Sequence, residues 1–190
     1  MAEYTSRAVR RVLTAALLLP ASVLLAACGV HHPSFADPNN NGSYVVAGPV
    51  NYQVQVSREL NQYGSEDSGY LAGLPGKDAN LAPTQLWFAV FMWAKNTTDQ
   101  PQLTTSAFDI MDTQGNVYHP IVFNNPYVWT SKMLKPGAVE PSPDTTAGFG
   151  PTQGGLLLFK VNTSIYSNRP LALQIRGNTG KVWATVALDL

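Results

Sequence analysis

The sequence predicts an all-β protein, an antiparallel β-sandwich of about seven strands. Short segments in which apolar and polar residues alternate recur along the chain, and a period of two is typical of strands with one buried face. Stretches rich in Gly, Pro, Asn and Asp separate these segments and predict turns. No segment after residue 50 has convincing helical periodicity. Many short strands without helices favour a sandwich.

The first 27 residues have the organisation of an export signal. Three arginines lie between residues 7 and 11, and residues 12–27 form an uncharged run. This run is too short for a comfortable bilayer span and contains Pro20, which favours a signal peptide over a membrane helix. It ends in Leu25-Ala26-Ala27-Cys28, which resembles the lipobox of bacterial lipoproteins.

That resemblance implies that Cys28 receives lipid (diacylglyceryl and an acyl chain such as palmitate) and becomes the first residue of the mature protein. An ordinary secretory signal is the alternative, but Cys28 is the only cysteine of the chain and occupies the required position. Two or more acyl chains anchor a protein stably. We therefore expect membrane attachment through Cys28, on the extracytoplasmic face of the cell membrane or on an outer membrane if the cell has one.

Composition limits the possible functions of the remaining chain. About 160 residues suffice for one domain with its own core, and no second cysteine exists to form a disulfide. The mature chain is slightly acidic, which argues against binding to nucleic acid. Residues 28–49 are rich in turn formers and predict a flexible tether, so we expect the domain to span residues 50–190. His31 and His32 in this tether are too few ligands for a metal site.

The first predicted strand of the domain begins at Val50. Apolar residues alternate from Val50 to Val56, and they predict one buried face. Residues 58–84 then lose all periodicity and contain many glycines and prolines among scattered Tyr and Leu. A connection of this length is often functional, although it can also serve only to cover a sheet.

The strongest strand signal spans residues 86–94. Both faces are apolar, because Phe88, Val90 and Met92 alternate with aromatic residues. A strand of this kind is either central and covered on both sides or exposes an aromatic patch. The candidate binding patch consists of Trp87, Phe91 and Trp93. The alternative, which we favour, is that the second sheet or residues 58–84 cover these side chains.

The rest of the chain supplies further strands. Residues 107–112 and 117–122 flank Thr113-Gln114-Gly115-Asn116, which predicts a hairpin. Alternation predicts strands again over residues 157–161, 171–176 and 182–188.

Several of these segments together resemble a known family. They are Val90-x-Met92-x-Ala94-x-Asn96, residues 107–112 followed by Gly115-Asn116-Val117-Tyr118, Leu134-Lys135-Pro136-Gly137, and Phe159-Lys160-Val161. This pattern resembles the immunoglobulin-like domain of the mycobacterial MPT63-type antigens and the related DUF4352 group. The resemblance covers about half of the chain, and residues 58–84 depart from it. It implies an immunoglobulin-like sandwich in an envelope or secreted binding module, with no catalytic residues to transfer.

Candidate catalytic residues are sparse. His119 is the one histidine of the predicted domain, and no Gly-x-Ser-x-Gly motif accompanies it. Asp109 and Asp112 lie on opposite faces of a strand because their spacing is odd, so they are not expected to act as a carboxylate pair. The sequence therefore predicts no catalytic residue, no metal site and no cofactor.

Two classes of function remain open. The first is a lipid-anchored, non-enzymatic binding or accessory module of the cell envelope, whose partner is an unidentified envelope protein or ligand. The second is an envelope hydrolase with a site built from loops. A substrate-binding subunit of an importer is disfavoured, because a single sandwich offers no cleft between two lobes.

Overall fold

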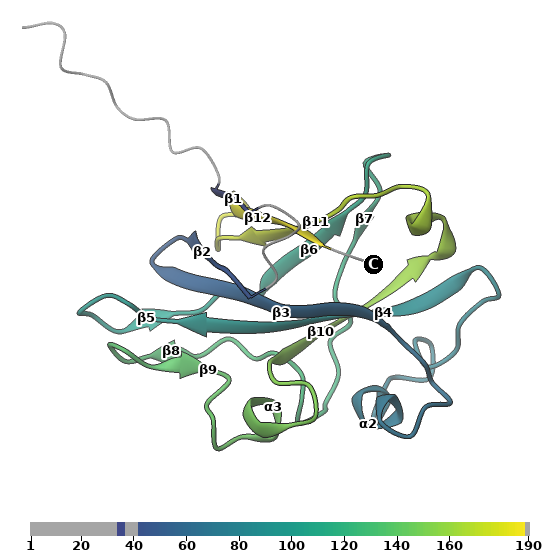
Figure 1. Ribbon diagram of the computed structural model, residues 1–190, viewed down its shortest axis with the longest axis horizontal. Helices are drawn as coiled ribbons and strands as arrows, with labels where there is room; N and C mark the ends of the chain where they lie inside the picture. Colours follow the sequence, from purple (N-terminus) through teal and green to yellow (C-terminus); the bar gives the residue numbers. More distant parts are fainter. Residues whose placement is uncertain (1–33, 37–41, 189–190) are drawn as a thin grey trace, which may run out of the picture. The chain divides into compact units, whose positions relative to one another are not determined.

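The computed structural model describes residues 34–36 and 42–188, which form a β-sandwich of two sheets (Figure 1). Sheet A has the order β1-β12-β11-β6-β7. Its strands are β1 (Ser34–Ala36), β6 (Ala107–Met111), β7 (Val117–Tyr118), β11 (Leu171–Arg176) and β12 (Val182–Leu188). Pairing is antiparallel except between β1 and β12, which run parallel.

Sheet B has the order β10-β4-β3-β2, and all its pairs are antiparallel. Its strands are β2 (Tyr44–Ala47), β3 (Val50–Leu60), β4 (Gln85–Lys95) and β10 (Gly155–Asn162), with the short β9 (Val139–Glu140) paired to β4. Outside the two sheets lie β5 (Gln102–Leu103) paired with β8 (Met133–Leu134), and the short helices α2 (Asp67–Leu71), α3 (Thr146–Phe149) and η2 (Thr163–Tyr166). Within the described residues seven strands are four or more residues long, so the predicted all-β antiparallel sandwich is confirmed.

The main core lies between the two sheets. Strand β4 contributes Phe88, Val90 and Met92 to it, and these face alternating apolar residues of β11 and β12. The core also contains Tyr52, whose hydroxyl accepts a hydrogen bond from the Thr105 backbone N–H at 2.7 Å. Burial raises the pKa of Tyr52 to about 12, against the opposing effect of this hydrogen bond, so its hydroxyl stays neutral.

Thr105 connects the sheets through hydrogen bonds. Its carbonyl accepts from the Trp129 indole at 2.9 Å, and its hydroxyl donates to the Arg176 carbonyl of sheet A at 2.6 Å. Because Tyr52 belongs to sheet B, the polar atoms of Thr105 bind to both layers. Thr105 is 2% exposed, so these bonds satisfy groups that water does not reach.

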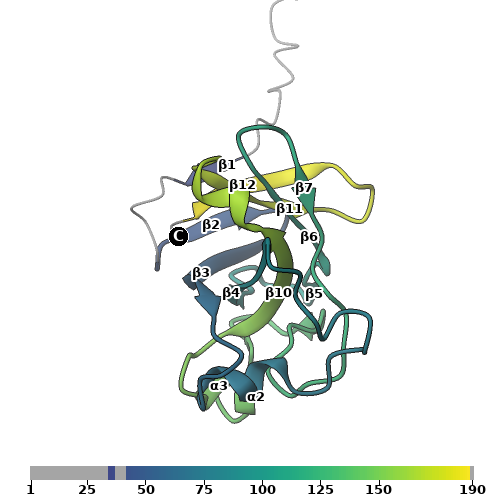
Figure 2. The same ribbon diagram turned by 90° about the vertical axis from the view of Figure 1, so that its right-hand side faces the viewer.

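A second apolar cluster lies on the outer face of sheet B. It contains Trp87 and Phe91 of β4, Leu156 and Leu158 of β10, and Tyr70 of α2. Residues 61–84 and residues 121–128, which we call the cover, supply further apolar side chains to it. Figures 1 and 2 show α2 on the side of sheet B away from sheet A. From Leu86 to Met92, β4 is therefore buried on both faces, which is the alternative that we favour from its sequence.

A β-bulge in β3 changes which face its residues occupy. The register with β4 shifts between Val54 and Val56, so Gln55 is left without a Cα partner. Val54 lies in the main core, whereas Val56 pairs with Phe91 and packs on the outer cluster. The prediction that Val56 shares the face of Val54 is wrong, because a bulge inserts one extra residue into the alternation.

The sandwich begins earlier than the sequence predicts. Within the predicted tether, residues 28–49, both β1 and β2 pair with strands of the sandwich. Val45 and Ala47 are 5% and 0% exposed and belong to the main core. The boundary at residue 50 is therefore wrong, because two strands precede it. The predicted signal peptide, residues 1–27, Cys28 and the histidines at 31 and 32 lie outside the described residues.

The predicted hairpin after residue 107 is confirmed in its first part. β6 and β7 pair antiparallel across a turn in which Gly115 has a φ of 82°, a conformation that favours glycine. However, β7 ends at Tyr118 and is shorter than the predicted strand.

The two faces of β4 give the first test of the fold. Phe88 and Phe91 are both 0% exposed, one in each cluster, so replacing either by Ala should destabilise the protein by about 3–5 kcal/mol. Chemical unfolding measures the change, with Val122→Ala as the control, since Val122 is 88% exposed. A Phe91→Ala variant as stable as Val122→Ala would show that the cover does not bury this face.

Candidate functional site

The predicted patch of Trp87, Phe91 and Trp93 does not form one exposed surface. Trp87 is 1% exposed and Phe91 is 0% exposed, because the cover packs over both. Only Trp93 is partly accessible. The three side chains do share the face opposite to Phe88, as predicted, but for Trp87 and Phe91 that face is a second core. The hypothesis of a binding patch at these two residues is therefore wrong.

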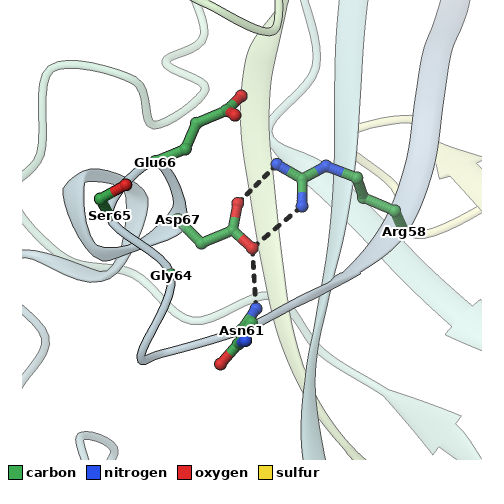
Figure 3. A pocket seen from close by; sticks show the side chains of 6 residues that line it. All are labelled: Arg58, Asn61, Gly64, Ser65, Glu66 and Asp67. Atoms are coloured by element: carbon green, nitrogen blue, oxygen red, sulfur yellow. Dashed lines mark hydrogen bonds and ion pairs between the residues drawn. The ribbon is translucent and has the colours of Figure 1, made fainter.

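A shallow polar depression lies where the cover leaves β3 (Figure 3). Arg58 and Asp67 face each other there, with Nη2 2.6 Å from Oδ1 and Nη1 3.1 Å from Oδ2. The backbone N–H of Asn61 donates to the same carboxylate at 2.8 Å. Asp67 is the first residue of α2, so this contact attaches the helix to the sheet.

Two of the charges in this depression, Arg58 and Asp67, are already paired with each other. The hydrogen bond from Arg58 lowers the pKa of Asp67, against the opposing effect of burial, and the Asn61 N–H lowers it further. The same hydrogen bond raises the pKa of Arg58, so both groups stay ionised at neutral pH. The guanidinium carbon also lies 6.0 Å from the centre of the Phe91 ring. A two-pronged ion pair of this kind positions a loop and leaves Asp67 poorly suited as a base.

Two other contacts fix the cover. The Asn125 side-chain amide donates to the carbonyls of Gly69 and Ala72, both at 2.9 Å. The Tyr70 hydroxyl accepts from the Thr152 backbone N–H at 3.0 Å. These bonds join residues 69–72 to Asn125 and Thr152, which are more than fifty residues away in sequence. We conclude that residues 61–84 cover the outer cluster as a fixed layer.

His119 forms part of a polar cluster on sheet A. Its Nδ1 lies 2.6 Å from Oδ1 of Asp109, and Nε of Arg176 lies 2.7 Å from Oδ2 of the same carboxylate. The His119 side chain is 74% exposed. Nucleophilic catalysis needs a hydroxyl or thiol beside the base. Within residues 34–36 and 42–188, His119 makes no hydrogen bond to such a group, and its prediction as a surface residue is confirmed.

Asp112 holds the turn after β6, as predicted. Its carboxylate accepts from the backbone N–H groups of Gln114 and Asn116, both at 2.9 Å. The side-chain amides of Asn116 and Asn168 donate to it at 2.8 and 3.0 Å. Burial raises the pKa of Asp112, but these four hydrogen bonds outweigh burial and leave the pKa lowered. It shares no partner with Asp109, so the two do not form a catalytic pair.

The described residues offer no recognisable metal centre or membrane span. Among residues 34–36 and 42–188, no three His, Cys, Asp or Glu side chains come close enough to hold a metal ion. The same residues contain no helix that is long and apolar enough to cross a bilayer. Asn96, a formal glycosylation acceptor, is 0% exposed and donates to the Leu134 carbonyl at 3.0 Å.

Within residues 34–36 and 42–188, no segment packs over one part of the outer face of sheet B. We call it the open face, and it consists of two cross-strand rows with one further residue. The rows are Tyr44, Gln53 and Trp93, and Val46, Asn51 and Lys95; the further residue is Gln55 at the bulge. Tyr44 is 49% exposed and Val46 58% exposed, whereas the three amides and Trp93 are half-buried. The open face is the candidate binding surface of the described domain.

The sequence analysis identifies only Trp93 of this surface. Tyr44 and Val46 fall within the predicted tether, where Gly and Pro on both sides conceal the four-residue strand. Gly48 and Pro49 separate β2 from β3, and Gly48 has a φ of 62°. A two-residue connection that begins with glycine is a hairpin signal, and it could have located β2.

Comparisons with known proteins add similarities of fold. No family model matches the chain, and no curated protein matches it. A candidate lipoprotein (ycdA) from Bacillus subtilis is 11% identical with a TM-score of 0.46; the match covers 77% of this chain but only 38% of that one. A conserved hypothetical protein from Bacillus anthracis is 13% identical with a TM-score of 0.43, over 73% of this chain and 87% of that one.

An uncharacterised β-sandwich protein from Clostridium difficile is 11% identical with a TM-score of 0.41, over 83% of this chain and 93% of that one. This chain thus spans well under half the length of the Bacillus subtilis protein. The resemblance to MPT63-type and DUF4352 domains stays a prediction, since no family model matches. The function proposed below rests on residues of this chain.

The ion pair of the cover gives a second test. Asp67→Asn removes the charge but keeps the size, and the weakened bonds should cost about 1.5–3 kcal/mol of unfolding free energy. Hydrogen exchange should also accelerate over residues 61–74. Glu66→Gln is the matched control, since Glu66 lines the same depression and is exposed. Equal stability and equal exchange rates in the two variants would show that the Arg58–Asp67 ion pair does not hold this part of the cover in place.

Asp112 gives a test of pH dependence. Its folded pKa lies below the unfolded value, so its stabilisation is complete above about pH 4 and is lost as the pH falls through the folded pKa. Asp112→Asn should lower the unfolding free energy by about 1.5–3 kcal/mol at pH 7 and flatten its fall in acid. Urea unfolding from pH 7 to pH 2 measures both effects, beside exposed Asp99→Asn. An acid slope unchanged from wild type would refute this role for Asp112.

Proposed function

We propose that this protein is a lipid-anchored, non-enzymatic binding module on the extracytoplasmic face of the cell membrane. The observation that carries the proposal is Leu25-Ala26-Ala27-Cys28, placed after an uncharged run that follows three arginines. Cys28 is the only cysteine in the chain, so the residue that lipidation requires occurs once and at the required place. The lipobox-like segment supports the proposed location, and the open face supports the proposed binding role.

The binding role is supported by a contrast between the carboxylates of the domain, which stabilise the fold, and the exposed side chains of the open face. Asp67 is paired with Arg58, and Asp112 accepts hydrogen bonds from its own turn, so both carboxylates stabilise the fold. The open face differs, because Tyr44 and Val46 lie in a regular strand yet are 49% and 58% exposed. Exposed aromatic and apolar groups on a rigid sheet are typical of binding surfaces.

A hydrolase is the alternative, and the Asp109–His119 contact is the observation that favours it. A carboxylate bound to Nδ1 is the arrangement that orients a catalytic histidine. Arg176 also binds this carboxylate and makes Asp109 part of a salt bridge. An enzyme would lose activity in His119→Gln while keeping its stability, whereas a binding module would keep its ligand affinity in that variant.

The anchor is tested by Cys28→Ala. The wild type should fractionate with membranes and incorporate labelled palmitate, whereas the variant should be released or should keep its signal peptide and take up no label. Val122→Ala is the control, because Val122 is 88% exposed and remote from Cys28 in sequence. If Cys28→Ala migrates and fractionates like the wild type, the protein is not anchored through this residue.

A further inference from the structure

We propose that the open face binds a neutral glycan chain. This inference deepens the binding function proposed above and rests on it for its setting outside the cytoplasm. The open face combines two aromatic side chains, three primary amides, one aliphatic side chain and one lysine on adjacent strands. The bulge at Gln55 forms its boundary, because beyond it β3 turns Val56 toward the covered cluster.

The aromatic pair supplies a flat apolar contact. Tyr44 and Trp93 are both aligned with Gln53, on the strands either side of it, so their side chains emerge from the same face of the sheet. Sugar rings carry patches of C–H groups, and such patches pack against the faces of aromatic rings. Two rings separated by one intervening strand lie on strands about 9.5 Å apart and can contact separate sugar units of an extended chain.

The amides supply hydrogen bonds suited to hydroxyl groups. Each primary amide carries two donor hydrogens and an acceptor oxygen, and sugar hydroxyls both donate and accept. Gln55 Nε2 donates to Gln53 Oε1 at 2.6 Å, and Gln53 Nε2 donates to the Gly42 carbonyl. The bonds among these groups hold the two glutamine side chains in place. Within the described part of the chain the Asn51 amide and the Tyr44 hydroxyl form no hydrogen bonds, so both can bind a ligand.

The charge of the open face selects the partner. None of its seven residues is acidic, and Lys95 is the single cation among them. A basic peptide finds no carboxylate there, and a polyanion finds only one positive charge. A neutral chain with many hydroxyl groups matches both the amides and the low charge.

The test uses the purified full chain in detergent and immobilised neutral polysaccharides: β-1,4-glucan, chitin, mannan and galactan. We expect saturable binding to at least one of them. Tyr44→Ala and Trp93→Ala should each weaken that binding about tenfold, as removal of a central aromatic contact does, and Asn51→Ala should weaken it several-fold. Tyr63→Ala and Phe149→Ala are matched controls, because these side chains are 89% and 83% exposed elsewhere and should leave the affinity unchanged.

The variants and an anionic probe make every outcome decisive. Tyr44→Ala and Asn51→Ala alter accessible side chains, so circular dichroism should show the wild-type fold even if Trp93→Ala is unstable. Absence of binding to all four polysaccharides overturns the proposal, as does binding that neither Tyr44→Ala nor Asn51→Ala weakens. Polygalacturonate is the anionic probe. If it binds more strongly than the four neutral polysaccharides, charge drives the binding and the proposal of a neutral ligand is overturned. A dimer in sedimentation that Tyr44→Ala dissociates would show that a second copy occupies the face.

The test of glycan binding and the test of anchoring give independent results. The polysaccharide assay needs no membrane, so its result does not depend on Cys28. If Cys28→Ala stays with membranes while the open face binds glycan, the anchor is wrong and the ligand class stands. If the anchor is confirmed and no polysaccharide binds, the proposed location stands and the ligand class is wrong.

Discussion

The burial of both faces of β4 is the constraint on which the rest of the domain depends. One apolar face can be satisfied by a second sheet, and sheet A provides this through the main core. The other face carries Trp87 and Phe91, whose exposure to water would be strongly unfavourable. The cover buries these two side chains and forms a third layer on sheet B. Its position is fixed by the hydrogen bonds of Arg58 to Asp67, of Asn125 to Gly69 and of Thr152 to Tyr70.

The bulge in β3 determines where the third layer stops. On one side of Gln55 the outer face of β3 presents Val56 and Leu60, which pack beneath the cover. On the other side it presents Asn51 and Gln53, whose amides suit contact with water. One extra residue thus separates the covered core from the open face within a single strand. The open face and the covered part of β3 belong to the same hydrogen-bonded ladder with β4.

The sequence predicts the elements whose pattern is local. The two-faced strand β4, the turn at Gly115 and the role of Asp112 depend on near neighbours and can be inferred from them. The bulge cannot be inferred, because alternation from Val50 to Val56 looks unbroken in one dimension. The open face escapes prediction for a different reason. Its rows join Tyr44 to Gln53 and Trp93, and this set exists only after three strands have paired.

Because the sandwich begins at β1, only a short chain separates the domain from the proposed anchor at Cys28. β1 begins at Ser34, six residues after Cys28, so the connecting chain spans about 20 Å at full extension. A tether of the length predicted from sequence would have reached several times farther. The proposed lipid on Cys28 would therefore confine the domain to a thin layer beside the bilayer. Ligands deeper in the envelope are then accessible only if they extend inward to the membrane surface.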